Sequence, residues 1–368
     1  MRPMERAEKT GGVRGRFALS PFVVIWEVTR ACDLACVHCR ASAIAERESG
    51  ELDTEEGISL IGQVREFGRP VFVLTGGDPL KRPDIQTLIR AAADAGLPTY
   101  MSPSGTPLLT HASLMRAKES GLLGVSISLD GSNEEIHDRF RGVAGSFRNS
   151  LTAAASAVAL GLKLQINTTL TRHNLKDFPA IAELVSSLEA QRWTVFLLVP
   201  TGRAQAAQQI TAQETEEAFA WLYEYSKEAP FRIKTTEGPH YRRVALQRGA
   251  PSIEPSGGAV VSGTGSGGGR FIPGMNDGSG FLFIGSKGVI HPSGFLPLAA
   301  GNVRHDSLLR VYREHPLFVA LRDPDRLEGR CGRCEFRAIC GGSRARAFGL
   351  TGNVFAEDPA CAYVPGAN

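Results

Sequence analysis

Three cysteines, Cys32, Cys36 and Cys39, lie within eight residues of one another and follow the apolar run at 22–26. Spacings of four and three residues let one short loop turn all three thiols toward a single soft metal centre. A four-iron cube held by three cysteines keeps one iron without a protein ligand, and an open coordination position is typical of a reactive metal site. The alternatives are a zinc loop, although structural zinc needs four ligands, and a group of buried free thiols.

The part of the chain from about 22 to 200 alternates apolar, β-branched runs with amphipathic stretches. This alternation predicts a parallel sheet with crossover helices. Right-handed crossovers curl such units into an open barrel, in which the functional loops lie at the C-terminal ends of the strands. The three-cysteine loop therefore falls at the top of the first of six expected strands, which span 22–28, 71–75, 98–102, 123–129, 162–170 and 193–199.

With this placement the sequence resembles the radical S-adenosylmethionine (SAM) enzymes, whose signature is C-x3-C-x2-C after the first barrel strand. In that family the open iron is chelated by the amino and carboxylate groups of SAM. One electron from the cluster then cleaves SAM to methionine and a 5′-deoxyadenosyl radical. The resemblance implies an α/β fold, an open TIM-like (β/α)6 barrel, a [4Fe-4S] cluster with SAM on Cys32, Cys36 and Cys39, and a reductant such as flavodoxin or ferredoxin.

Residues at the ends of the later strands are similar to the SAM contacts of that family. Gly76, Gly77 and Asp78 look like its Gly-Gly-Glu motif, which holds the SAM amino group, with Asp78 in place of Glu. Two glycines and an acid are also a common turn. The resemblance implies further contacts to the ribose or the methionyl part of SAM from Ser128 and Asp130, and to its adenine from Val199 and Pro200. Ser104 after the third strand and Asn167 in the fifth are further candidates for contact with SAM.

Two of these positions also have a structural interpretation. Asp130 precedes Gly131, so its side chain could simply cap a turn. Asn167 shares one face of the fifth strand with Gln165 and Thr169. Polar residues at a period of two inside a barrel need partners, which either a ligand or a hydrogen-bonded network in the core would supply.

Basic and titratable residues gather after an expected strand at 231–235. Arginine presents a bidentate fork to carboxylates, so we predict that Arg242 and Arg243 bind substrate carboxylates at the mouth of the barrel. His240 and Tyr241 are candidate catalytic residues beside them, and Arg304 is a further candidate for binding substrate. The alternative is the start of a helix with a solvated basic face.

The segment 251–280 is rich in Gly, Ser and Pro, which predicts a linker or lid at a domain boundary. A hairpin signature and a cysteine-rich region follow it. We therefore divide the chain into an N-terminal extension at 1–20, a barrel at 21–250, the linker at 251–280 and a small C-terminal extension that binds a cluster at 281–368.

The C-terminal part carries the other four of the seven cysteines, Cys331, Cys334, Cys340 and Cys361. An odd count without a secretory signal argues for thiolate ligands rather than disulfides. Four thiolates form a closed site, for either one zinc ion or a fully ligated four-iron cluster. The segment is similar to the SPASM/Twitch extensions of radical SAM enzymes, which implies an auxiliary cluster. Because no thiol lies in the hairpin loop at 291–295, we predict one auxiliary [4Fe-4S] cluster.

The segments 292–297, 301–304 and 340–347 look like the radical SAM subgroup that modifies tetrapyrroles. This resemblance implies an oxidoreductase or lyase that abstracts hydrogen from a propionate side chain of a haem-type tetrapyrrole, with decarboxylation or loss of the side chain. The alternative is a peptide maturase that forms a crosslink or an epimer. Many such enzymes carry a leader-peptide domain ahead of the barrel, for which about twenty residues are too few. An electron carrier or a zinc-stabilised interaction module would leave the open iron position without a purpose.

Composition excludes other classes of function. A net charge of +3 over 368 residues gives no case for binding nucleic acid. The stretch 1–16 is charged and lacks the apolar core of a signal peptide, and no apolar run is long enough to span a bilayer. We expect a soluble, cytoplasmic protein without a membrane partner.

Overall fold

The structure, a computed structural model, describes residues 17–250 and 274–366. The N-terminal extension predicted at 1–20 and the linker predicted at 251–280 lie mostly outside these residues. None of the described helices is both long and apolar enough to span a lipid bilayer.

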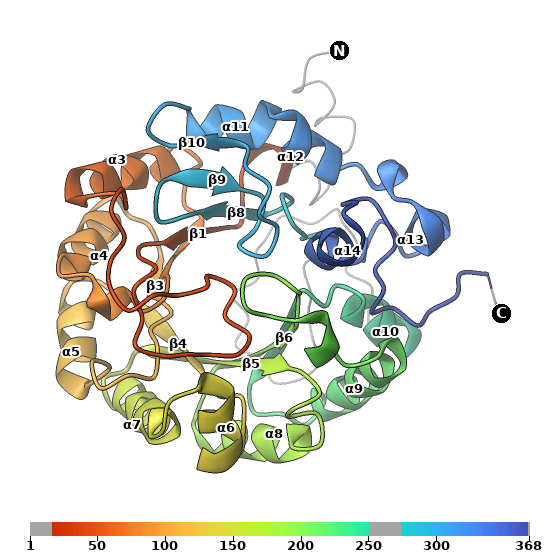
Figure 1. The fold of residues 1–368 in the computed structure, drawn as a ribbon, viewed down its shortest axis with the longest axis horizontal. Coiled ribbons are helices and arrows are strands. Elements are labelled where there is room, and N and C mark those ends of the chain that lie inside the picture. The colour runs from red at the N-terminus through yellow and green to blue at the C-terminus, as the bar shows by residue number, and fades with distance from the viewer. Residues whose placement is uncertain (1–16, 251–273, 367–368) are drawn as a thin grey trace.

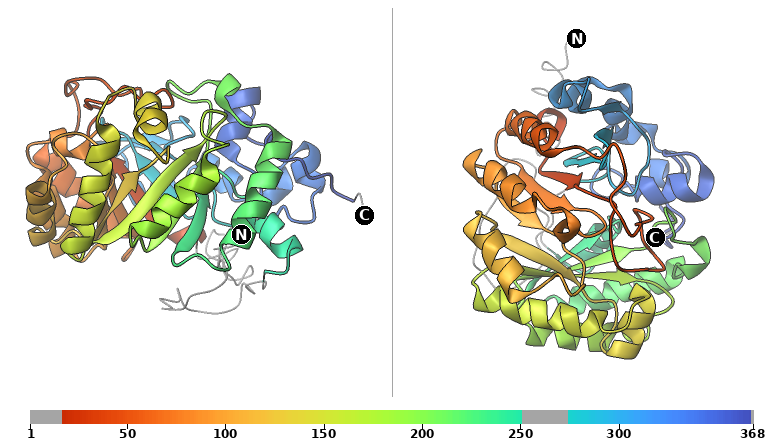
Figure 2. Two further views of the ribbon diagram at one scale, coloured as in Figure 1. Left: turned by 90° about the horizontal axis from the view of Figure 1, so that it is seen from below. Right: turned by 60° about the vertical axis from the view of Figure 1, so that its left-hand side comes forward.

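One ten-stranded sheet organises the described residues, in the order β10-β9-β8-β1-β2-β3-β4-β5-β6-β7. The strands from β1 to β7 run parallel, and the sheet curves into an open barrel surrounded by helices (Figure 1, Figure 2). The strands from β1 to β6 confirm the six predicted ones. The parallel strands are β1 (Val23–Glu27), β2 (Val71–Thr75), β3 (Thr99–Met101), β4 (Gly124–Ser128), β5 (Lys163–Leu170), β6 (Arg192–Leu197) and β7 (Arg232–Thr236).

The connections between these strands contain the helices that cover the outer face of the sheet (Figure 1). The first of them begins with a capping box, in which Asp53 and Glu56 each accept a hydrogen bond from the other's backbone N–H. The elements are α3 (Thr54–Arg65), η1 (Pro79–Lys81), α4 (Ile85–Asp94), α5 (His111–Glu119), α6 (Glu134–Arg141), α7 (Ser146–Ala159), α8 (Phe178–Ser187), η2 (Ala206–Gln208), α9 (Ala212–Tyr225) and α10 (Tyr241–Gln247).

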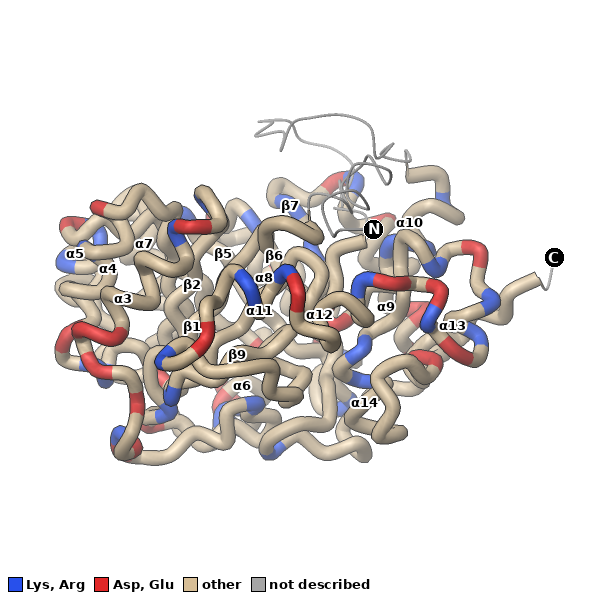
Figure 3. The backbone as a smooth tube through the Cα atoms, turned by 90° about the horizontal axis from the view of Figure 1, so that it is seen from above, with Lys and Arg blue, Asp and Glu red and all other residues tan. Residues whose placement is uncertain are grey.

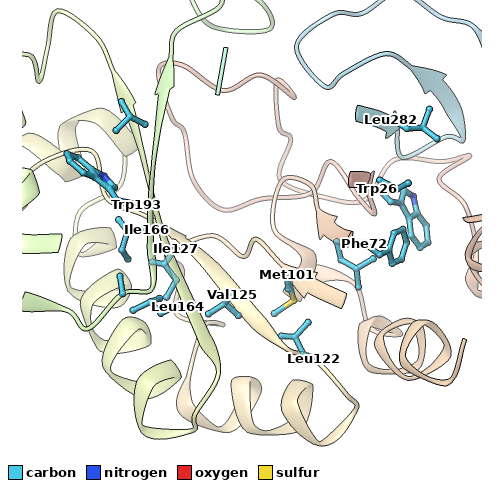
Figure 4. Packing of buried hydrophobic residues seen from close by; sticks show 14 of the residues in the cluster. Trp26, Phe72, Met101, Leu122, Val125, Ile127, Leu164, Ile166, Trp193 and Leu282 are labelled. Carbon is cyan, nitrogen blue, oxygen red and sulfur yellow. The ribbon is translucent and has the colours of Figure 1, made fainter. Parts of the chain in front are cut away.

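The main hydrophobic core lies between the sheet and these helices, because alternate strand residues point outward. Trp26 of β1 and Phe72 of β2 lie side by side in it (Figure 4). Gly57 lets α3 approach closely, since a Cβ at this position would lie 2.6 Å from Cη2 of Trp26. The inner face carries polar residues such as Ser128 and Asn167, which suits it to bind a ligand.

The sheet continues across the predicted domain boundary at 281. β8 (Phe281–Ile284) pairs parallel with the edge of β1, and β9 (Val289–His291) returns antiparallel to β8. β10 (Gly301–Asn302) pairs with β9. An exposed strand edge presents unpaired backbone groups, and β8 satisfies those of β1. The predicted hairpin therefore forms, but it extends the barrel sheet.

Short helices follow the hairpin, and the last two of them lie on the same side of the barrel as α9 and α10 (Figure 1). They are α11 (Leu308–Glu314), α12 (Pro316–Leu321), η3 (Pro324–Arg326), α13 (Gly329–Arg333) and α14 (Arg344–Thr351). Basic and acidic positions are interspersed along the backbone (Figure 3), in keeping with the small net charge.

Candidate active site

The three cysteines that follow β1 lie together at the C-terminal end of the barrel strands. Cys32 and Cys36 are buried, Cys39 is half-buried, and all three are free thiols in one small cluster with Leu34. The N–H of Leu34 donates to Sγ of Cys32, and the N–H of Ala43 donates to Sγ of Cys39. Donors aimed at sulfur favour the thiolate, which is the form that binds metals.

Cationic groups surround this loop. Arg141 of α6 lies with Nη1 3.8 Å from Sγ of Cys36, and Arg203 donates to the carbonyl of Cys36. Burial raises the pKa of Cys36, and the charge of Arg141 opposes that rise. Within the described residues, Nε of Arg141, Nη2 of Arg203 and Nδ1 of His38 are buried without a hydrogen-bond partner. Orphaned donors beside three free thiols fit an anionic iron–sulfur cluster, whose sulfides accept hydrogen bonds.

Gly76 and Gly77 bring the end of β2 against the cysteine loop. The N–H of Gly77 donates to the carbonyl of Thr29, and the N–H of Asp78 donates to that of Ala31. A Cβ on Gly76 would lie 2.3 Å from the carbonyl oxygen of Thr29, and one on Gly77 would lie 2.4 Å from that of Ala31. Only glycine permits this approach of two backbones.

The carboxylate of Asp78 is buried and already has donors. It accepts from the N–H groups of Leu80 and Ser104 and from the hydroxyl of Thr106. The hydroxyl of Ser104 donates to the carbonyl of Gly77 at 2.7 Å and lies 3.4 Å from Sγ of Cys32. The structure thus brings Asp78 and Ser104 to the first cysteine, where Asp78 positions the neighbouring loop.

Asp130 is fully buried and holds an arginine that sequence reasoning missed. Its carboxylate accepts from the N–H of Thr169 at 2.7 Å and forms an ion pair with Arg141. Burial raises the pKa of Asp130, and Arg141 opposes the rise. Through this pair, Asp130 places a guanidinium group against Cys36. Arg141 ends the helix after β4, and nothing in its local sequence distinguishes it from a surface arginine.

Ser128 and Asn167 are cross-strand neighbours on the inner face. Oδ1 of Asn167 accepts from the side chain of Gln165 at 2.8 Å, so the predicted polar face forms a network. Val199 is buried against Leu296 and Ala345, where the segment after β6 meets the C-terminal part of the chain. Pro200, the next residue, packs against Gly349 of α14.

The structure does not bring the three predicted substrate-binding arginines together. Arg304 pairs with Glu56 of α3, with Nε 2.6 Å from Oε1. Arg243 forms a bidentate pair with Glu216, at 2.6 and 2.5 Å. Arg242 instead donates to the backbone carbonyls of Ile339 and Met275. The sequence shows these charges but not the distant groups that lie opposite them.

His240 and Tyr241 are buried at the start of α10 rather than exposed at the mouth of the barrel. Both rings pack against Phe219. His240 also lies near Asp358, with 3.9 Å between Nδ1 and Oδ2. Burial lowers the pKa of His240 to about 4 and raises the pKa of Tyr241 to about 12, so neither group changes its charge near neutral pH.

The four C-terminal cysteines line one pocket and are all free thiols. All four receive donors on sulfur: the N–H of Asp358 at 3.4 Å from Cys331, the N–H of Gly342 at 3.4 Å from Cys340, Nη2 of Arg243 at 3.8 Å from Cys361, and the backbone N–H of Phe336 at Cys334. Cys334 is the fourth thiol of the pocket. Burial raises the pKa of all four thiols. Backbone and guanidinium donors around four free thiols fit a fully ligated cluster.

Neither thiol group has the geometry of a site for one metal ion. Within the part of the chain that the structure describes, no three His, Cys, Asp or Glu side chains are arranged to hold a single ion. In a four-iron cluster each cysteine binds a different iron, so the thiols need not converge on one point.

Both the sequence and the fold of this chain are similar to those of known proteins. A family model described as the Radical SAM superfamily matches residues 26–185. The AdoMet-dependent heme synthase of Oleidesulfovibrio alaskensis is 42% identical over 345 residues, which cover 93% of this chain and 87% of that protein. The AdoMet-dependent heme synthase of Methanosarcina barkeri is 37% identical, with 94% of this chain and 98% of that protein covered. The crystal structure of Streptococcus suis SuiB bound to precursor peptide SuiA has a TM-score of 0.71 at 16% identity, covering 94% of this chain and 76% of that one, which shows a shared fold.

Proposed function

This chain belongs to the radical SAM superfamily, and we propose that it removes the carboxyl group from a propionate side chain of a haem-type tetrapyrrole. The observation that carries this proposal is the similarity to AdoMet-dependent heme synthases, because at 93% of this chain it extends beyond the barrel into the part that carries the four-cysteine pocket. Two anionic-cluster sites on one chain, one of them with three thiols, agree with radical chemistry on a small molecule.

Most of the predicted cofactor residues have a direct task in this proposal, whereas Asp78 and Asp130 position their neighbours. When bound, the three-thiol [4Fe-4S] cluster and SAM supply a 5′-deoxyadenosyl radical, which takes a hydrogen atom from the substrate. Cys32, Cys36 and Cys39 hold that cluster, and Arg141 neutralises part of its charge. Gly76 and Gly77 present backbone carbonyls to the SAM amino group. Ser104, Ser128, Asn167, Val199 and Pro200 surround the rest of SAM, and the pocket of Cys331, Cys334, Cys340 and Cys361 holds the auxiliary cluster.

The substrate reaction balances with one external oxidant. Removal of a hydrogen atom from the propionate carbon next to the ring leaves a carbon radical. Breaking the bond to the carboxylate then releases CO₂, forms a vinyl group and gives up one electron to a one-electron acceptor. A reductant of the flavodoxin or ferredoxin type supplies the electron that cleaves SAM.

Label transfer tests this proposal. Anaerobically reconstituted and reduced protein is mixed with SAM and iron coproporphyrin that is deuterated in its propionate side chains. We expect deuterium in 5′-deoxyadenosine and a tetrapyrrole in which vinyl replaces propionate, with neither product from a Cys36→Ala control. Formation of 5′-deoxyadenosine without deuterium from the tetrapyrrole would reject this substrate, and label arriving from a peptide would establish the peptide maturase instead.

A further inference from the structure

Four cations share the inner face of the sheet near the N-terminal ends of three neighbouring strands. Residues at a period of two along a strand point to the same face. Leu164 and Trp193 occupy the outer face, in the core (Figure 4), and Ile233 of β7 belongs to the same core. The residues between and beside them therefore face inward. The inner-face cations, called the basic group below, are Lys163 of β5, Arg192 of β6, and Arg232 and Lys234 of β7.

Strand register places these cations side by side. Arg192 and Arg232 are directly opposite each other across β6 and β7, and Lys234 is opposite Thr194 in the next inward-facing row. In β5 the residue opposite Arg192 is Gln165, and Lys163 is the inward-facing residue that precedes Gln165. The basic group thus lies toward the end of the barrel away from the cysteine loop.

No acidic side chain neutralises the basic group within the described residues. Arg192 donates to the amide oxygen of Gln165 at 3.3 Å, and Nζ of Lys234 lies 5.3 Å from the centre of the Phe281 ring. Burial and the nearby charges of Arg192 and Arg242 lower the pKa of Lys234 to about 8. Lys234 is half-buried, whereas Lys163, Arg192 and Arg232 are exposed at the rim. A partly buried cation without an acidic partner costs free energy that a bound anion would recover.

The row that contains Lys234 also contains two of the residues proposed to contact SAM. Across neighbouring strands, Ser128 pairs with Asn167, Asn167 with Thr194, and Thr194 with Lys234. Lys234 is two strands away from Asn167, which corresponds to about 10 Å across the inner face. A ligand beside SAM at one end therefore has to span only about 10 Å to meet the basic group at the other.

We propose that the basic group, with Lys234 at its centre, binds substrate carboxylates that are not under attack and so selects a polycarboxylate substrate. This inference rests on the proposed function, because a tetrapyrrole carries its propionates around a macrocycle. While one propionate lies beside SAM, others extend away from it. Lys234 and the arginines are specificity-determining residues in this arrangement, since they contact carboxylates that do not react.

Anaerobic Soret titrations test the role of Lys234. The probes are iron coproporphyrin, with four propionates, and its tetramethyl ester, with none. Lys234→Met should weaken binding of the tetra-acid by about ten- to a hundredfold, as expected for the loss of a charged hydrogen bond. Lys234→Arg should retain most of the affinity. The ester should bind the wild type and Lys234→Met equally, and the control Arg148→Gln, at an exposed position of α7, should match the wild type with both probes.

The possible outcomes separate a failure of this inference from a failure of the proposed function. Tight binding of the tetra-acid by Lys234→Met and Arg192→Gln, with label transfer intact, would overturn the inference alone. A wild-type protein that neither binds a tetrapyrrole nor takes label from one would overturn both. If Lys234→Met loses iron, the exposed rim variant Arg232→Gln decides: weaker binding at full iron content supports the inference, and unchanged binding overturns it.

Discussion

Replacing Asp130 by Ala should destabilise the protein, because the change leaves Arg141 without its counter-charge. Asp130 is fully buried, and only 12% of the Arg141 side chain is exposed. Removal of one partner from a buried ion pair costs about 3–5 kcal/mol, since the other charge stays in a site of low dielectric. For a chain of 368 residues, the usual entropy of unfolding per residue converts this loss into a fall of about 4–6 °C in melting temperature.

Thermal unfolding of the anaerobically prepared holoenzyme, followed by circular dichroism, measures this effect. The double variant Asp130→Ala/Arg141→Met removes both charges and should regain most of the lost melting temperature. Glu134→Ala, which breaks an exposed pair with Arg148, is the matched control and should cost no more than about 1 kcal/mol. Equal losses in the single and double variants would refute the assignment of the effect to the ion pair. Both variants should cleave SAM more slowly, because a guanidinium group no longer lies in place against Cys36.

Three further predictions concern the glycine loop, the pH dependence of binding and the metal content. Gly77→Ala should destabilise the protein by about 1–3 kcal/mol and weaken SAM binding, because the added Cβ meets a backbone carbonyl. A Cβ added at Gly62 of α3 meets no atom within 4 Å, so the control Gly62→Ala should leave the melting temperature unchanged or raise it. Affinity for iron coproporphyrin should fall as the pH rises through about 8, because Lys234 loses its proton there, and titrations of Lys234→Met over the same range should show a flatter profile. Iron and sulfide analysis should give about eight irons per chain, falling to about four in Cys331→Ala/Cys334→Ala; about twelve in the wild type would contradict a single auxiliary cluster.

Local patterns in the sequence were sufficient to predict the barrel strands, both cysteine groups and the glycine turn. Each of these depends on residues close together in the chain, such as Cys32 to Cys39 or Gly76 and Gly77. Pairing of β8 with β1 joins residues more than 250 positions apart, so the predicted boundary at 281 fell inside a continuous sheet. Strand propensity shows that a hairpin forms but not which edge it joins.

The roles of the charged residues depended most on distant partners. Arg243 and Arg304 looked like carboxylate-binding groups because the sequence near them is basic, yet Glu216 and Glu56 meet them from other elements. Arg141 drew no attention, although Asp130 and Cys36 both lie against it. An isolated charge in a sequence carries no information about its counter-charge.

Cations with an acidic partner and cations without one lie at different ends of the barrel. At the C-terminal ends of the barrel strands, Arg141 forms an ion pair with Asp130 and contacts Cys36. Beside the four-cysteine pocket, Arg243 forms an ion pair with Glu216. These arginines stabilise anions that belong to the protein and its clusters. Toward the N-terminal ends of β5, β6 and β7, the basic group has no acidic side chain as a partner among the described residues. We therefore expect a substrate with several carboxylates to bind there through those that do not react, with the remaining propionate directed toward the end where SAM is proposed to bind.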